Sequence, residues 1–152
     1  MFTITSPAFA EGELIPREYS CEGNDSSPEL RWSHAPEGTQ SFALICDDPD
    51  APVGVWTHWV AYDIPAATTS LAKGNVHPPK GMKEGVQSGK KMGYRGPCPP
   101  PGHGPHRYYF TIYALDCASL ELRVGADRGA LEKAMSGHVI GKATYMGRYE
   151  RK

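Results

Sequence analysis

The apolar residues of this chain recur mostly with the period of two that is typical of β-strands. Residues 41–48 (SFALICDD) are apolar at both odd and even positions, which predicts a strand covered on both faces. Residues 56–64 (WTHWVAYDI) and 106–116 (HRYYFTIYALD) predict two more strands. Further strands are predicted at 2–5 (FTIT), 30–33 (LRWS) and 138–149 (HVIGKATYMGRY).

The strands predicted at 56–64 and 106–116 each carry a histidine near their start. Strict alternation of side chains along a strand would place His58 on the same face as Trp56, Val60, Tyr62 and Ile64. The same rule places His106 with Tyr108, Phe110 and Ile112. Each histidine is thus expected beside aromatic and aliphatic residues, at an end of its strand.

Only one helix has clear signals. Asp127 is a suitable N-cap for residues 128–135 (RGALEKAM), and Gly137 can end the helix. The segment 65–105 is rich in glycine, proline and lysine and predicts mainly loops. Many short strands with a single late helix predict an antiparallel β-sandwich.

The length and the net charge of the chain limit the classes of protein to which it can belong. The 152 residues favour a single domain spanning 1–152. A net charge of -1 offers no basic footprint, so nucleic acid is not expected as a partner. No apolar run reaches the roughly 18 residues of a membrane span. The first residues, MFTITSPAFAEGEL, lack the basic region of a signal peptide, and a cytoplasmic location is therefore expected.

The four cysteines, Cys21, Cys46, Cys98 and Cys117, are far apart and form no C-x-x-C motif. Neither a zinc ribbon nor a thioredoxin-like motif is therefore present. We expect each cysteine to be a small buried hydrophobic residue or an unreactive thiol, although the spacing leaves a disulfide open.

Polar groups gather at the ends of the predicted strands. The sequence DDPDAP (47–52) ends one strand, His58 lies in the next, and the glycine- and proline-rich segment 93–108 ends in His106-Arg107-Tyr108. Three kinds of chemistry fit these residues. Asp48, His58 and His106 could bind a metal; Cys98 with His103 or His106 could form a thiol hydrolase; or imidazoles and tyrosine hydroxyls could bind an anion. The spacing does not decide among them.

Four motifs carry a resemblance to a known family. They are DPDAP (48–52), Trp56-x-His58-Trp59, GYRGPCPP (93–100) and GHGPHRY (102–108). Supporting segments are Asn24-Asp25-x-Ser27-Pro28-x-Leu30-x-Trp32 and Pro36-x-Gly38-Thr39-x-Ser41-Phe42. Together and in this order, from about residue 5 to 147, they resemble the phosphatidylethanolamine-binding protein family, also called the Raf kinase inhibitor protein family, in its bacterial and archaeal branch. The segment SGKKMGY (88–94) departs from the family pattern, which puts the shape of one pocket rim in question.

The resemblance implies a mainly β fold, an antiparallel Greek-key β-sandwich with one or two short helices. It also implies a small pocket for phosphate-like or carboxylate-like groups, including a phospholipid headgroup. By position, the ligand-binding residues would be Asp48, His58, His106, Trp56, Pro97 and Tyr108, and the residues that support the pocket would be Asp50, Pro52 and Arg107. Asp50 and Arg107 would form an ion pair, and the Ala51-Pro52 bond would be cis.

A non-enzymatic binding protein is the function that this resemblance favours, with no catalytic residue, no metal and no cofactor. Its partners would be a small anionic ligand and a protein such as a kinase or a protease, which it would inhibit or scaffold; a homodimer is also open. A metal-assisted or thiol-dependent hydrolase in the same pocket is the alternative. If His58 and His106 take up protons, anion binding should strengthen as the pH falls from about 8 to 6.

Overall fold

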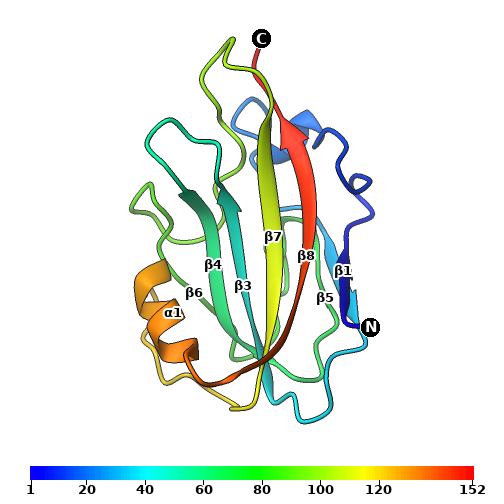
Figure 1. The fold of residues 1–152 in the computed structure, drawn as a ribbon, viewed down its shortest axis with the longest axis vertical. Coiled ribbons are helices and arrows are strands. Elements are labelled where there is room, and N and C mark those ends of the chain that lie inside the picture. Colours follow the sequence, from blue (N-terminus) through cyan, green and yellow to red (C-terminus); the bar gives the residue numbers. More distant parts are fainter.

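Two antiparallel sheets pack face to face in the computed structural model, which describes residues 1–152 (Figure 1). The larger sheet has five strands in the order β6-β4-β3-β7-β8: Lys83–Glu84, Trp56–Pro65, Ser41–Asp48, His106–Leu115 and Val139–Tyr149. The smaller sheet has three strands in the order β1-β2-β5: Thr3–Thr5, Leu30–Ser33 and Ser70–Leu71. The predicted antiparallel β-sandwich is confirmed.

The order β6-β4-β3-β7 within the larger sheet is that of a Greek key. After β3 and β4 pair as neighbours, the chain makes the short strand β5 in the other sheet before it returns as β6. The following strand, β7, then crosses to the far side of β3 and pairs with it along most of its length. Strand β3 is therefore central and has a partner on both edges.

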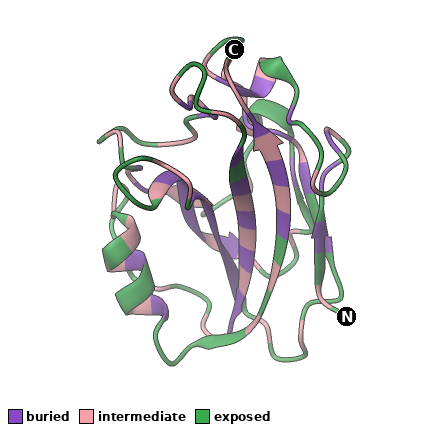
Figure 2. Ribbon diagram, turned by 45° about the horizontal axis from the view of Figure 1, so that its top comes forward, coloured by how far each residue is buried: buried purple, intermediate pink, exposed green.

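The main core lies between the two sheets and is rich in aromatic residues. Its buried side chains from the larger sheet include Phe42, Leu44, Cys46, Trp59 and Phe110, and those from the smaller sheet include Ile4, Leu30, Trp32 and Leu71. A second cluster on the outer face of β3 and β4 is covered by Leu131 and Met135 of the helix. Figure 2 shows that the buried residues concentrate on β3, β4 and β7. Strand β3 is covered on both faces, as its sequence predicts.

The helix α1 spans Arg128–Met135, as predicted, and lies on the outer face of the larger sheet (Figure 1). The Asp127 side chain accepts a hydrogen bond of 2.9 Å from the backbone N–H of Ala130, which caps the helix. Two single turns of 3₁₀-helix, η1 (Arg17–Tyr19) and η2 (Lys73–Asn75), complete the helical structure. No helix combines the length and the apolar composition that crossing a membrane would need.

Strand β4 does not alternate strictly, which corrects the prediction for its faces. Asp47 pairs with Thr57 and Cys46 pairs with Trp59, so His58 is an extra residue that opposes none in β3. A second irregularity near Asp63 shifts Ile64 to the same core as Trp59. Val60 and Tyr62 face the helix instead. The bulge at His58 therefore turns the imidazole to the inner side of the sheet, where Trp59 also packs.

The segment 65–105 is mostly loop, as predicted, but contains the short strands β5 and β6 and the turn η2. The Ala51-Pro52 bond is trans, because the structure contains no cis peptide bond, and the prediction of a cis bond is wrong. The expectation of unreactive free thiols is also wrong for two cysteines. Cys21 and Cys98 form a disulfide, whereas Cys46 and Cys117 are free thiols.

Candidate functional site

A cavity of about 400 Å³ opens at one end of the sandwich. It is lined by Asp48, Ala51, Pro52, Val53, Trp56, His58, Arg95, Cys98, Pro99, Pro100, His106, Tyr108 and Arg151. Five of the six residues predicted to bind a ligand are therefore brought together: Asp48, His58, His106, Trp56 and Tyr108. The polar ones come from three strands that are adjacent in the sheet.

Antiparallel pairing explains why these residues meet. Asp48 is the last residue of β3, and Trp56 and His106 are the first residues of β4 and β7. The end of a strand lies beside the start of each antiparallel neighbour, so Asp48 pairs with Trp56 on one edge. On the other edge Asp47 pairs with Tyr109, which brings Asp48 next to the first residues of β7.

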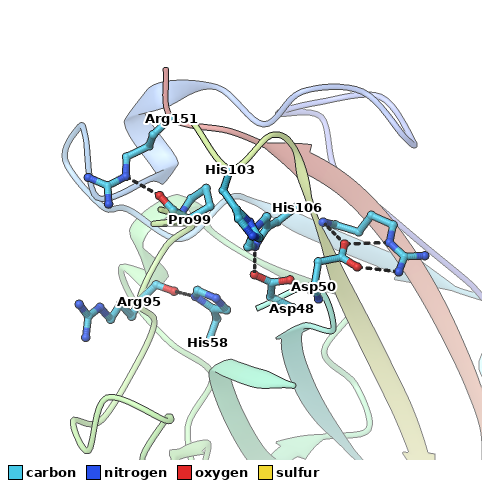
Figure 3. A network of polar contacts seen from close by, with 9 residues as sticks. Asp48, Asp50, His58, Arg95, Pro99, His103, His106 and Arg151 are labelled. Carbon is cyan, nitrogen blue, oxygen red and sulfur yellow. Dashed lines mark hydrogen bonds and ion pairs between the residues drawn. The ribbon is translucent and has the colours of Figure 1, made fainter. Parts of the chain in front are cut away.

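A chain of polar contacts runs from Asp48 through His106 to His103 (Figure 3). His106 Nδ1 lies 2.7 Å from Asp48 Oδ2, and His106 Nε2 lies 2.6 Å from His103 Nδ1. Asp48 Oδ1 accepts a further hydrogen bond of 2.7 Å from the backbone N–H of Asp50. Asp48 and His106 are only 3% and 2% exposed, so this carboxylate is satisfied by protein donors. Both nitrogens of His106 have partners.

His58 is held differently. Its Nδ1 lies 2.6 Å from the backbone carbonyl oxygen of Arg95, so Nδ1–H donates and the neutral ring keeps a lone pair on Nε2 (Figure 3). The ring packs between Trp56 and Tyr108, with centroid distances of 4.7 and 5.2 Å. Burial lowers the pKa of His58 to about 4. His58 therefore remains neutral between pH 8 and 6, contrary to the expectation from the sequence that it takes up a proton in this range.

Tyr108 lines the cavity, and its hydroxyl oxygen is buried without a hydrogen-bond partner in the protein. Burial, together with the nearby charge of Asp48, raises the pKa of this phenol, which stays protonated and able to donate. A buried polar group without a partner costs free energy of about 1–3 kcal/mol. The hydroxyl is thus a group that a bound molecule could satisfy.

The ion pair predicted between Asp50 and Arg107 is present beside the cavity. Arg107 Nη2 and Nε lie 2.8 and 2.9 Å from the two carboxylate oxygens of Asp50. The Asp50 carboxylate also accepts from the Arg107 backbone N–H at 2.9 Å. These bonds hold the pKa of Asp50 at about 2 and tie the loop after β3 to the start of β7.

Comparison with known proteins agrees with this architecture. The family model for the phosphatidylethanolamine-binding protein matches residues 5–150. A UPF0098 protein of Aquifex aeolicus is 47% identical over 150 residues, which cover 97% of this chain and 88% of that protein. The chain belongs to the phosphatidylethanolamine-binding protein family.

Two solved structures of family proteins resemble the whole chain. Escherichia coli YbcL, described as a new member of the mammalian family, superposes with a TM-score of 0.93 at 33% identity and covers 99% of each chain. A homologue from Chlamydia trachomatis superposes with a TM-score of 0.91 at 38% identity, covering 99% of this chain and 98% of the other. The fold is therefore that of the family from one end of the chain to the other.

Within this family fold, the prolines that line the cavity differ from those predicted. Pro97 does not line the cavity; its carbonyl oxygen accepts a hydrogen bond of 3.1 Å from the Cys21 backbone N–H. Pro99 and Pro100 face the cavity in its place. Pro52, predicted as a supporting residue, is itself part of the lining.

Two arginines of the cavity were missed by reasoning from the sequence. The Arg95 guanidinium lies 5.4 Å from the centroid of the Trp56 ring, and Arg151 Nε donates to the Pro99 carbonyl oxygen at 2.7 Å (Figure 3). Arg95 lies inside the GYRG motif and could have been noticed there. Arg151 follows β8, and only the pairing of β8 with β7 brings it to the cavity.

The segment 88–94, which departs from the family pattern, packs against two residues of the cavity lining, Arg95 and Trp56. A Cβ added to Gly89 would lie 2.7 Å from Arg95 Nη1 and 3.3 Å from the Trp56 ring, so the backbone here packs directly against both side chains. The Ser88 hydroxyl accepts from the Thr57 backbone N–H at 2.8 Å. This segment therefore supports Arg95 and Trp56 from outside the cavity.

The geometry bears on both enzyme alternatives, the thiol-dependent hydrolase and the metal-assisted hydrolase. Cys98 is bonded to Cys21, so the cavity offers no free thiol for a hydrolase. His58, the second ligand of the hypothetical metal site, has its Nδ1 turned to the Arg95 carbonyl. The only group of three His, Cys, Asp or Glu ligand atoms within 4.8 Å of one another lies elsewhere in the molecule.

Proposed function

We propose that this protein is a non-enzymatic binding protein that holds a small phosphate-like or carboxylate-like group in the cavity at the end of the sandwich. The observation that carries this proposal is the buried Tyr108 hydroxyl, which has no hydrogen-bond partner in the protein. Its proton can be donated to a ligand oxygen, which would remove the cost of leaving it unpaired.

The charges around the cavity favour an anion. Arg95 makes no ion pair or hydrogen bond through its guanidinium group, and Arg151 uses only Nε. Their remaining N–H groups can bind a phosphate or carboxylate in the two-pronged manner typical of arginine. The one acidic residue of the lining, Asp48, already accepts bonds from His106 and Asp50.

The neutral state of His58 favours a ligand that carries a hydrogen-bond donor beside its anionic group. Because its Nδ1–H donates to the Arg95 carbonyl oxygen, Nε2 can accept a hydrogen bond from a ligand but cannot donate one. A phosphate group that keeps one proton, or a headgroup with an ammonium, could bind the arginines and Tyr108 through its oxygens and His58 through its N–H or O–H. The volume of about 400 Å³ is within the usual range for a small-molecule site.

Binding is favoured over catalysis by the lining itself. The lining contains no serine, threonine or lysine; its one cysteine, Cys98, is in a disulfide, and the phenol of Tyr108 stays protonated. The inhibition of a kinase or a protease stays a prediction from the family resemblance.

Titration calorimetry with phosphate, acetate and phosphoethanolamine tests the proposal. We expect weak binding of at least one of them and a loss of roughly tenfold or more, about 1.4 kcal/mol, in Tyr108→Phe. Tyr113→Phe is the matched control, because Tyr113 lies on the same strand, outside the cavity lining. The proposal fails if none of the three anions binds the wild type, or if both variants lose affinity equally.

A further inference from the structure

A cluster of metal-binding side chains lies at the opposite end of the larger sheet from the cavity. Asp116, Cys117 and His138 each offer one ligand atom, and these atoms all lie within 4.8 Å of one another. Asp116 follows the last residue of β7 and His138 precedes the first residue of β8, whereas the cavity is at the beginning of β7. The two ends of β7 lie at opposite ends of the larger sheet (Figure 1). We propose that these three residues bind a divalent cation of the zinc type.

The backbone fixes all three positions. The Asp116 N–H donates to the His138 carbonyl oxygen at 3.0 Å, which continues the pairing of the two strands by one step. The Cys117 carbonyl oxygen accepts from the buried Ser41 hydroxyl at 2.6 Å, and the His138 N–H donates to Met135 at 2.8 Å. The cluster is therefore built on hydrogen-bonded backbone, and only side-chain rotation is needed to adjust it.

The side chains are already oriented toward one another. His138 Nδ1 lies 2.8 Å from Asp116 Oδ1, and both side chains are 46% exposed, so a cation can reach them from solvent. Cys117 is a free thiol of intermediate exposure, partly covered by the apolar cluster beneath the helix. The cluster thus combines two solvent-exposed ligands, Asp116 and His138, with the half-buried sulfur of Cys117.

Thiolate, imidazole and carboxylate are the three ligand types of zinc sites in proteins. Bonds of 2.0–2.3 Å in a tetrahedral site place ligand atoms about 3.3–3.8 Å apart. The separations here are at most 4.8 Å, so the longest would contract by up to roughly 1 Å, whereas the 2.8 Å between His138 Nδ1 and Asp116 Oδ1 would open by about 0.5 Å. Three protein ligands leave the fourth position to water or another molecule. The thiol proton passes to solvent as the sulfur–metal bond forms, and no oxidation state changes.

Cobalt(II) chloride alone is the probe, added to the metal-free full-length protein with its disulfide intact. We expect one bound ion per chain with a thiolate-to-cobalt charge-transfer band, displaced by one equivalent of zinc. Cys117→Ser should abolish the band, and His138→Asn should weaken cobalt binding by roughly tenfold or more. The free but buried Cys46 provides the matched control, and Cys46→Ala should leave the band unchanged.

The separate variant His106→Ala distinguishes this site from the cavity, since none of the three residues lines the cavity. The band should survive in His106→Ala whether or not anion binding does. Absence of the band in the wild type, its survival in both Cys117→Ser and His138→Asn, or its loss in His106→Ala would overturn the proposal. Circular dichroism establishes that each variant is folded.

Discussion

The charge of His58 is decided by its surroundings in the sandwich. His58 is 5% exposed, and burial lowers the pKa of its imidazole from the ordinary value of about 6.5 to about 4. In the unfolded chain the same imidazole takes up a proton as the pH falls below about 6.5. Between these two values only the unfolded state binds the proton, so the free energy of unfolding falls as the pH is lowered through this window.

The free energy of unfolding should therefore depend measurably on pH through His58. Between pH 7 and pH 5, His58 should account for a loss of about 2 kcal/mol in the free energy of unfolding. Urea unfolding at the two pH values should therefore show a decrease that is smaller by about this amount in His58→Gln. His77→Asn, which changes an exposed histidine, should keep the wild-type dependence. Equal dependence in His58→Gln and the wild type would contradict the argument.

At the scale of elements, the segment 93–100, which forms part of the cavity lining, depends on the close contact of Gly96 with Tyr19 and Asp25. A Cβ on Gly96 would lie 2.1 Å from the Tyr19 carbonyl oxygen and 2.4 Å from Asp25 Oδ1. The Gly96 N–H donates to this same carboxylate at 2.8 Å. Only a residue without a side chain lets the segment 93–100 dock against the first loops of the chain, which places Arg95, Cys98 and Pro99 at the cavity.

We therefore predict that Gly96→Ala lowers the free energy of unfolding by about 2 kcal/mol or more, because backbone atoms must move to admit the methyl group. Gly129→Ala is the opposite control: it lies in α1 with no atom within 3.4 Å of the added Cβ, and should be neutral or stabilise by up to about 0.5–1 kcal/mol. Chemical denaturation measures both. A Gly96→Ala protein as stable as the wild type would show that the wall is free to shift.

On the scale of the whole molecule, the disulfide ties the N-terminal loops to the cavity wall across 77 residues of sequence. A bond that closes so long a loop reduces the conformational freedom of the unfolded chain, and loss of such bonds commonly costs about 2–5 kcal/mol. The Cys21 N–H also donates to the Pro97 carbonyl, so the covalent link and a hydrogen bond join the same two segments.

The double variant Cys21→Ser/Cys98→Ser should therefore melt roughly 5–15 °C below the wild type in calorimetry. The wild type in the presence of a reducing agent should match it, while Cys117→Ser in metal-free buffer should melt close to the wild type. An unchanged melting temperature in the double variant would mean that the disulfide does not stabilise the fold. The cytoplasmic location stays a prediction, and thiol labelling of protein from acid-quenched native cells would show whether the disulfide exists there.

The positions of the main strands, the helix and the sandwich class could all be predicted from the amino-acid sequence. Residues 41–48 and 128–135 match β3 and α1 at both ends, because their signals are local: apolar periodicity, an N-cap at Asp127 and a stop at Gly137. The motifs also named most of the cavity, since Asp48, Trp56 and His106 sit at strand ends that antiparallel pairing must bring together.

The protonation states and the contact partners of those residues could not be predicted in the same way. The bulge at His58, the disulfide between Cys21 and Cys98, and the approach of Arg151 depend on contacts between segments far apart in the chain. Periodicity cannot show an extra residue in one strand, because a bulge exists only relative to its partner strand. The charge of His58 and the unpaired hydroxyl of Tyr108 likewise arise from burial, which the folded chain creates and no short motif contains.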